Sequence, residues 1–325
     1  MPSRKPVRGS PIWWLRFIGL LAFLVVLWRL SSGPQNVQLT RFDPRWLGWC
    51  MTLTVGQLLL EAFVWQWLLR LQRIRQPYPK TLVNFLASQY LGTVTPGHVG
   101  EFLAAGYVSM ETGITFGYAL SSVVMKKVLS WTAMLGFGIW AVPLLAQFTV
   151  KQGAQRVALL GLLALVLLSA GIALWVVSLR RLARKWQRLS PWQIDMTEFR
   201  SGIRQLLSPK LLAPLAVTAL AFSLLFFQLD AVLRSLGLTL GMPLVAQIVA
   251  LSRVGGRVAP FSVFGWGSKD AAVIALLSQQ GIDPSVGLTA TLLLLVSSYL
   301  VTLLLSGLCW WIKPLVVPHA GESRS

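Results

Sequence analysis

Long apolar runs, separated by short polar segments, follow one another along most of the chain. Six of them have 19 or more residues and cover 12–30, 46–69, 116–147, 156–179, 211–236 and 286–312. About 20 apolar residues in a helix cross the hydrocarbon core of a bilayer, which is roughly 30 Å thick. The pattern therefore predicts an all-α polytopic membrane protein with about six transmembrane helices.

Two further apolar stretches are short and interrupted by proline and glycine. They are 81–95 with its continuation at 99–111, and 243–260 with its continuation at 267–280. A 15-residue helix is only about 22 Å long, too short to cross. A break such as Thr95-Pro96-Gly97 frees backbone groups, which at membrane depth must face protein or a water-filled cavity. We therefore predict two re-entrant helical hairpins, at 81–111 and 243–280.

The distribution of basic residues favours this topology. Suppose that each hairpin leaves the membrane on its side of entry. Four segments then lie inside, namely the N-terminus, 70–80, 180–210 and the C-terminus. In that order they hold 3, 4, 8 and 2 lysines and arginines. The outside loops then hold 4. If either hairpin crossed instead, the later loops would invert and the asymmetry would disappear. Because cytoplasmic loops are rich in lysine and arginine, we predict that both termini are cytoplasmic.

The order span, hairpin, span occurs twice, at 46–147 and at 211–312. The first unit would start outside and the second inside, which is the arrangement of an inverted-topology repeat, found in many secondary transporters. The rest of this single membrane domain comprises a first helix and outer loop (1–45), a connecting helix with a basic cytoplasmic loop (148–210), and a tail (313–325).

Composition excludes the soluble classes of protein. Of 325 residues, 55% are hydrophobic and 12% charged, with a mean hydropathy of +0.66, whereas soluble domains have roughly 25% charged residues. In a soluble protein the net charge of +19 would suggest nucleic-acid binding. Here the basic residues lie between apolar runs, so we expect membrane lipids as partners, no nucleic acid, and a multi-pass location in the cell (inner) membrane.

Motifs of the common enzyme classes are absent from the sequence. There is no Walker loop, no H-E-x-x-H, no G-x-S-x-G and no paired cysteine motif, and there are only two histidines. We therefore expect no metal, no cofactor and no catalytic residue, and we predict a transporter rather than an enzyme.

The two predicted hairpin tips combine glycines with charged residues. The first reads Thr95-Pro96-Gly97-His98-Val99-Gly100-Glu101, and the second reads Gly265-Trp266-Gly267-Ser268-Lys269-Asp270. Each tip leads into a short helix, whose N-terminal N–H groups suit a phosphate or carboxylate. Glycines let such a ligand approach the backbone. The alternative is that Glu101 and Asp270 only cap their own helices.

Further ionisable side chains occur at membrane depth, where each needs a partner or water. The basic ones in or beside the hairpins are Lys126, Lys127, Arg253, Arg257 and Lys269. They outnumber Glu101 and Asp270, so they favour an anionic ligand. Asp230 and Arg234 are spaced i, i+4, which favours a local pair that supports helix packing. For Glu61, packing and function stay equally open.

These residues form the predicted site for a lipid headgroup. The ligand-binding set is Pro96, Gly97, Gly100, Glu101, Lys126, Lys127, Gly265, Gly267, Lys269 and Asp270. The supporting set is Glu61, His98, Asp230, Arg253 and Arg257.

Taken in order, the motifs resemble the transmembrane, flippase-like region of lysylphosphatidylglycerol synthases, over about 47–312. That family shows P-G-x-x-G-E, then T-G-I/V and E-R-V-x-D, and later G-x-G-x-R-E-A; the corresponding segments here are 96–101, 112–114, 126–130 and 265–271. The resemblance implies a stand-alone form without the aminoacyltransferase domain. Charges are rearranged, since E-R becomes Lys126-Lys127 and R-E becomes Lys269-Asp270. An anionic lipid is therefore at least as compatible as the cationic lysyl lipid.

The residues and the resemblance together predict a lipid translocase. It would move a phospholipid or a polyprenyl-phosphate-type lipid between leaflets, through a polar cavity between the inverted repeats. Two alternatives remain open. One is a membrane-embedded glycosyl- or aminoacyl-lipid transferase, which needs an acid/base group and a donor site. The other is a non-transporting partner of envelope-biosynthesis enzymes, for which charge changes at the tips would be harmless.

Overall fold

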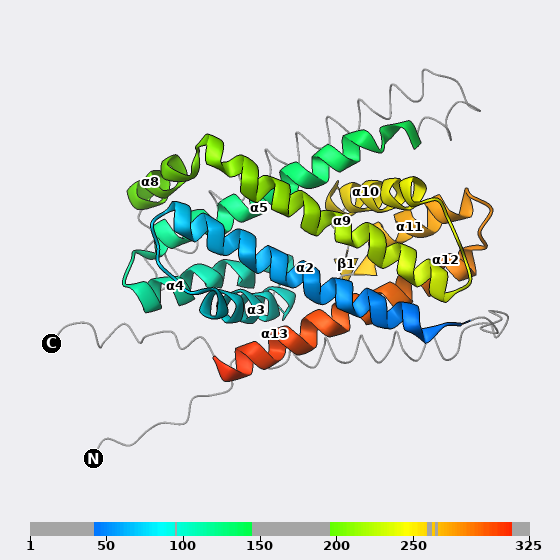
Figure 1. Cartoon of the computed structure of the whole chain (residues 1–325), viewed down its shortest axis with the longest axis horizontal. Helices are drawn as coiled ribbons and strands as arrows, with labels where there is room; N and C mark the ends of the chain where they lie inside the picture. Colours follow the sequence, from blue (N-terminus) through cyan, green and yellow to red (C-terminus); the bar gives the residue numbers. More distant parts are fainter. Residues whose placement is uncertain (1–41, 95, 145–195, 259–261, 264–265, 314–325) are drawn as a thin grey trace, which may run out of the picture.

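The computed structural model describes residues 42–94, 96–144, 196–258, 262–263 and 266–313, and within them the chain is almost entirely helical (Figure 1). The all-α prediction is therefore confirmed for this part of the chain. The predicted spans 12–30 and 156–179 lie outside the described residues.

Four helical segments of the described part are long and apolar enough to cross a membrane. They are Pro44–Leu71, Phe116–Leu144, Pro209–Ser235 and Pro284–Ile312. These agree with the predicted spans 46–69, 116–147, 211–236 and 286–312. The first two spans are formed by α2 (Pro44–Leu71) and α5 (Phe116–Trp140). The third consists of η4 (Pro209–Leu211) and α9 (Leu212–Ser235). The last consists of α12 (Pro284–Leu294), the π-helical η5 (Leu295–Leu300) and α13 (Val301–Ile312).

Local sequence explains where two of these spans begin. The Asp43 carboxylate accepts a hydrogen bond from the Arg45 backbone N–H at 3.0 Å, and proline follows it at the first helical position of α2. Asp283 does the same for α12, accepting from the Ser285 N–H at 2.8 Å. An acidic N-cap followed by proline is a strong helix start, since it satisfies one orphan donor and removes another.

The first broken stretch folds as three short helices. They are α3 (Tyr78–Val94), the 3-10 helix η2 (Pro96–Leu103) and α4 (Ala104–Thr112). The chain turns at the predicted break, and η2 packs back along α3. Gly113, with a φ of 72°, then ends α4, as a left-handed residue commonly does at a helix C-terminus.

The second broken stretch folds as a helical pair joined by a small β-hairpin. Helix α10 (Met242–Val258) leads to the antiparallel strands β1 (Ser262–Val263) and β2 (Trp266–Gly267), and α11 (Ser268–Ser278) follows. The sequence analysis did not predict these strands. As in the first stretch, the two arms pack side by side.

Side-chain contacts bring both arms of the first stretch to one end of the bundle. Glu111, near the end of α4, accepts hydrogen bonds from Gln76, just before α3, and from Asn84 of α3 at 3.2 Å. Lys313, directly after α13, pairs with Glu111 and donates to Asn84 at 2.9 Å. The start of α3, the end of α4 and the end of α13 therefore lie together.

The opposite end of the bundle holds the start of α2, the end of α9 and both outer ends of the second broken stretch. The Asp43 backbone N–H donates to the Ser235 carbonyl at 3.0 Å, which places the start of α2 beside the end of α9. Met242 at the start of α10 and Ile282 after α11 pack on one hydrophobic cluster, and both ends of this helical pair lie at the right of Figure 1.

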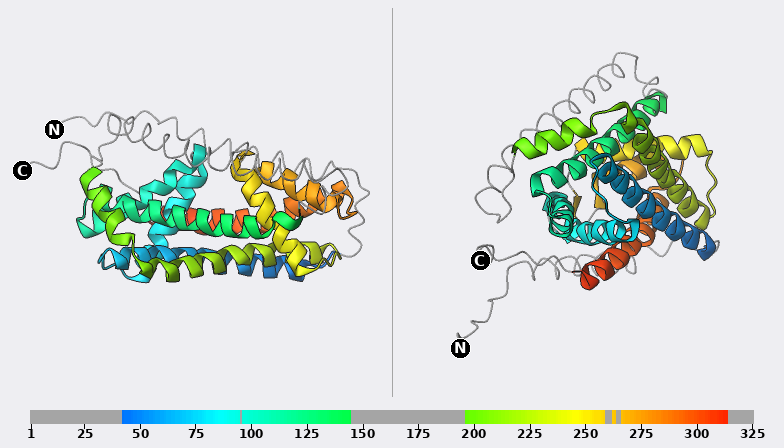
Figure 2. Two further views of the ribbon diagram at one scale, coloured as in Figure 1. Left: turned by 90° about the horizontal axis from the view of Figure 1, so that it is seen from above. Right: turned by 60° about the vertical axis from the view of Figure 1, so that its left-hand side comes forward.

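The two halves of the chain pack in a reciprocal way. Helices α2 and α9 run antiparallel and in extensive contact (Figure 1). Helix α3 packs against α13, the closing helix of the second half, and α10 packs against α5, the closing helix of the first. The two broken stretches approach from opposite ends of the long axis (Figure 2).

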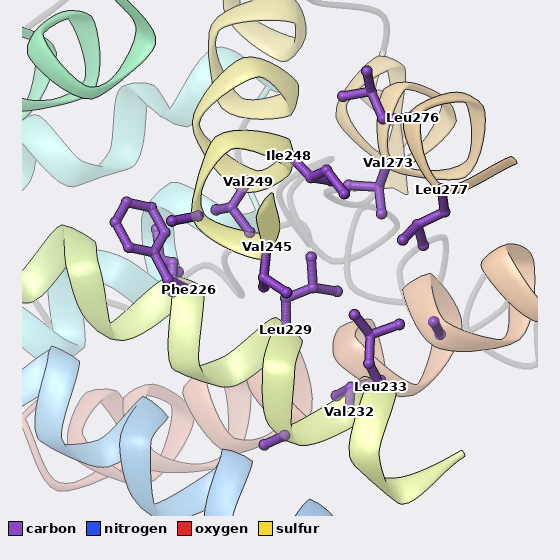
Figure 3. Packing of buried hydrophobic residues seen from close by; sticks show 14 of the residues in the cluster. Phe226, Leu229, Val232, Leu233, Val245, Ile248, Val249, Val273, Leu276 and Leu277 are labelled. Carbon is purple, nitrogen blue, oxygen red and sulfur yellow. The ribbon is translucent and has the colours of Figure 1, made fainter. Parts of the chain in front are cut away.

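The largest hydrophobic cluster fixes the second broken stretch in place. Leu229 and Leu233 of α9 meet Ile248 of α10 and Leu277 of α11, all of them fully or almost fully buried (Figure 3). In the first half a corresponding cluster surrounds Trp65 of α2. Burial of a side chain of this size is worth about 1.5–3 kcal/mol against water, but between membrane helices the main gain is close packing.

Candidate functional site

Two ion pairs join three elements of the first half. The Lys126 ammonium of α5 lies 3.0 Å from the Glu61 carboxylate of α2. The next residue, Lys127, pairs with Glu101 of η2. Three of the four side chains are at most one-fifth exposed, and Glu61 is 30% exposed. We call these four residues the first cluster.

Helix geometry explains why two adjacent lysines have different partners. Successive residues of an α-helix point about 100° apart, so Lys126 faces α2 while Lys127 faces η2. The Lys126 ammonium also lies 4.0 Å from the centroid of the Phe85 ring of α3, an arrangement that stabilises a cation with little water around it. The first cluster therefore ties the first broken stretch to two spans.

Two glycines allow the turn of this stretch to close. A Cβ added to Gly100 would overlap the Leu91 carbonyl group, and one added to Gly92 would overlap the Glu101 side chain. Gly100 therefore permits close backbone packing. That it also lets a ligand approach the backbone stays a prediction.

Glu101 corrects another prediction. It was expected at the start of a helix, where helix capping was the alternative to ligand binding. It lies instead toward the end of η2, and α4 begins at Ala104. The Glu101 carboxylate pairs with the Lys127 side chain, so its charge links η2 to α5.

A second polar group lies between α9, α10, α11 and α12. It lines a small pocket with apolar walls, and its polar members are Gln228, Ser252, Arg253, Lys269 and Asp270. Helix α10 and helix α11 approach closely here, since a Cβ on Gly256 would lie 2.8 Å from the Lys269 Cβ. We call these five residues the second cluster.

Asp270 has a structural role within this cluster. Its carboxylate accepts a hydrogen bond from the Gly267 backbone N–H at 3.0 Å, and the residue is 4% exposed. It therefore caps α11 in the way that the alternative interpretation of the sequence proposed. Because it also lines the pocket, it contributes a negative charge beside Arg253 and Lys269.

A chain of hydrogen bonds joins the two clusters across the α2–α9 contact. The Gln228 amide donates to the Gln57 carbonyl at 2.9 Å, and the Gln57 amide donates to Glu61 at 3.1 Å. Glu61 binds Lys126 through its other carboxylate oxygen. Polar side chains thus run from the second cluster to the first through Gln57 and Gln228.

The sequence analysis missed these two glutamines. Each lies inside a long apolar run, 46–69 or 211–236. An amide in that position is a usable signal, since lipid offers it no hydrogen-bond partner and neighbouring helices usually supply one.

The charges of the two clusters differ. In the first, two carboxylates face two ammonium groups, so the cluster is balanced. In the second, Arg253 and Lys269 line the same pocket as Asp270, so two cationic side chains and one carboxylate belong to its walls. The preference for an anionic ligand stays a prediction.

The remaining predicted residues have separate outcomes. Asp230 pairs with Arg234 at 2.7 Å within α9, as the spacing predicted, and the guanidinium lies 5.1 Å from the Trp46 ring. The backbone of Pro96, Gly97 and His98 forms the start of η2. The side chain of Arg257 and the whole of Gly265 lie outside the described residues. Within the described part, no three His, Cys, Asp or Glu side chains gather in a way that could hold a metal ion.

Comparison with known proteins identifies the family of this chain. The family model described as the lysylphosphatidylglycerol synthase TM region matches residues 14–306. No curated protein and no solved structure gives a significant match. Since the family match covers most of the 325 residues and agrees with the motifs at the two breaks, the chain belongs to the family of lysylphosphatidylglycerol synthase transmembrane regions.

Proposed function

We propose that this protein moves lipid molecules between the leaflets of a membrane. The observation that carries the proposal is the pair of partly buried charged clusters, each beside a broken helical stretch and joined to the other by hydrogen bonds. Charged side chains at membrane depth are unfavourable, so they are kept where they face a polar ligand or one another. A lipid headgroup would meet these clusters while its acyl chains remain in the bilayer.

The proposed architecture is an inverted-topology repeat of six spans with two re-entrant hairpins. The meeting of Gln76, Glu111 and Lys313 supports a first hairpin that returns to its side of entry. The reciprocal packing of α3 on α13 and of α10 on α5 supports two related halves. Antiparallel α2 and α9 support opposite orientations of those halves.

We place this protein in the cell (inner) membrane, with the basic end in the cytoplasm. The loop with Arg73 and Arg75, the α4–α5 turn and helix α8 (Met196–Leu206), which contains Arg200 and Arg204, belong to that end. The Tyr118 hydroxyl, near the start of α5, bonds to Gln205 of α8 and to the Gln72 carbonyl, which supports their common location. Cytoplasmic ends are typically the basic ones.

An anionic phosphate is the headgroup that fits best. The second cluster has two cations to one carboxylate, and Lys269 lies in the first turn of α11, where backbone N–H groups favour negative charge. The shared chemistry is that of a phospholipid or polyprenyl phosphate. We propose that this site transports such a lipid without changing it chemically.

Reconstitution tests this function directly. The purified chain is placed in liposomes with a trace of fluorescent phosphatidylglycerol, and its exposure to a membrane-impermeant quencher is followed. We expect transfer to exceed that of protein-free liposomes, and to exceed transfer of fluorescent phosphatidylcholine. Equal rates with and without protein would reject the proposal, and a new glycosyl- or aminoacyl-lipid in the extracted lipids would favour a transferase.

A further inference from the structure

Two consecutive side-chain hydrogen bonds, from Gln228 to Gln57 and from Gln57 to Glu61, lie at the contact between α2 and α9. Gln57 uses both ends of its amide there, since its carbonyl accepts from Gln228 at 2.9 Å and its amino group donates to Glu61 at 3.1 Å. Gln228 is 1% exposed. Both partners fix the orientation of the Gln57 amide, so a shift of either one changes the bond on the other side.

The ends of this link lie in different halves of the chain. Gln228 is a wall of the pocket that contains Arg253 and Lys269. Glu61 is the partner of Lys126, which precedes the Lys127–Glu101 pair. Within the part of the chain that the structure describes, these hydrogen bonds form a continuous polar route between the clusters. Around these bonds the two helices approach closely, since a Cβ added to Gly56 of α2 would lie 3.8 Å from a methyl carbon of Leu224 of α9.

We propose that Gln57 and Gln228 are positioning residues that couple the two headgroup clusters. When a phosphate engages Arg253 or Lys269, Gln228 adjusts, and Gln57 transmits the change to Glu61 and so to Lys126. Occupation of the second cluster would thereby change the strength of the Lys126–Glu61 pair, and with it the neighbouring Lys127–Glu101 pair that holds the first broken stretch. Alternating access needs a signal of this kind between halves. This inference rests on the proposed function, since it names the residues that would couple the two clusters during lipid transport.

Gln57 is the residue to change, because it does not line the pocket. Gln57→Met keeps the length of the side chain and removes both hydrogen bonds. Gln57→Asn keeps the amide but shortens its reach, and it serves if the first variant folds poorly. Gln66→Met is the matched control, since Gln66 is a buried glutamine of the same helix whose amide bonds to the Gln76 carbonyl at 3.1 Å.

The decisive measurement is a thermodynamic cycle on lipid binding. Affinity for phosphatidylglycerol is measured in nanodiscs of phosphatidylcholine, for the wild type and for Lys126→Gln, each with and without Gln57→Met. We expect Lys126→Gln to change the affinity by about fivefold or more in the wild-type background, the lower range of allosteric coupling. We expect a clearly smaller change in the Gln57→Met background, where only the direct contribution of the Lys126 charge remains, and the full effect in the Gln66→Met background.

Transport then separates this inference from the proposed function. If the wild type moves lipid and Gln57→Met slows it several-fold without lowering the thermal unfolding temperature, both are supported. If the wild type moves lipid and Gln57→Met and Gln228→Met move it equally fast, the coupling is wrong and the function stands. If the wild type moves no lipid, the function fails, and the binding cycle alone decides the coupling. An equal effect of Lys126→Gln in all backgrounds, or no effect in any, would overturn it.

Discussion

The Lys126 ammonium of α5 lies 3.0 Å from the Glu61 carboxylate of α2, with side chains only 12% and 30% exposed. Removing one partner leaves a charge at membrane depth without its counter-ion, which is more costly than removing both. We expect Glu61→Gln and Lys126→Gln each to lower the free energy of unfolding by about 1–3 kcal/mol, since the partial exposure reduces the full penalty.

The double variant makes this prediction specific. Glu61→Gln with Lys126→Gln should be less destabilised than the sum of the single variants, because no unpaired charge remains. Thermal unfolding in a neutral detergent, monitored by tryptophan fluorescence, gives the comparison. Additive losses would indicate that the two side chains do not interact in the folded protein.

Glu101 is expected to matter for transport more than for folding. It pairs with Lys127 between η2 and α5, beside the turn of the first broken stretch. Glu101→Gln keeps the shape of the side chain and unbalances the charge, so we predict a folded protein with lipid transfer reduced at least about tenfold, equivalent to about 1.4 kcal/mol. Lys127→Gln should have a similar effect. Wild-type transfer by Glu101→Gln would remove Glu101 from the site.

Two lysines with different neighbours test which charge the protein prefers in a lipid headgroup. Lys126 already faces Glu61, whereas Lys269 lines a pocket together with a second cationic side chain, that of Arg253. Lys269→Gln should therefore weaken the preference for phosphatidylglycerol over a cationic lipid more than Lys126→Gln does. Exposed Arg200 and Arg204 of α8 supply the control, since their change to Gln alters only the charge near the membrane surface. Competition binding in neutral detergent measures all four, and an equal loss at α8 would identify a general surface effect.

Gly100 should not tolerate even a methyl group. Its added Cβ would overlap the Leu91 backbone, whereas nothing lies within 4 Å of a Cβ at Gly136 of α5. Gly100→Ala should cost about 1–3 kcal/mol through overpacking and should slow lipid transfer. Gly136→Ala should be neutral or stabilise by up to about 1 kcal/mol, because alanine favours helix. The same unfolding assay compares the two, and equal stabilities would contradict the close contact between η2 and α3.

Topology is tested by cysteine labelling at Thr115 and Gln280. Both residues are exposed, and they follow the first and second broken stretches respectively. In a background without Cys50 and Cys309, we expect a membrane-impermeant maleimide to reach Thr115→Cys only from the cytoplasm and Gln280→Cys only from outside. Labelling of both from one side would show that one stretch crosses the membrane.

Local sequence is enough to predict the class of protein, the positions of the described spans and the two breaks between them. Length, hydropathy and proline or glycine act locally, so Thr95-Pro96-Gly97 ends α3 wherever the rest of the chain lies. The local pair Asp230–Arg234 was predictable for the same reason, since helical spacing alone brings the two side chains together.

The pairing of charged side chains, by contrast, depends on how the helices pack. Lys126 and Glu61 are 65 residues apart, and Gln57 and Gln228 are 171 apart, so their contacts depend on how α2 packs against α5 and α9. That packing gave each lysine of the adjacent pair its own carboxylate and brought Arg253, Lys269 and Asp270 to one pocket. It also made Gly100 a packing residue. Periodicity identifies the buried face of a helix, but helix-to-helix packing selects the partner that meets it.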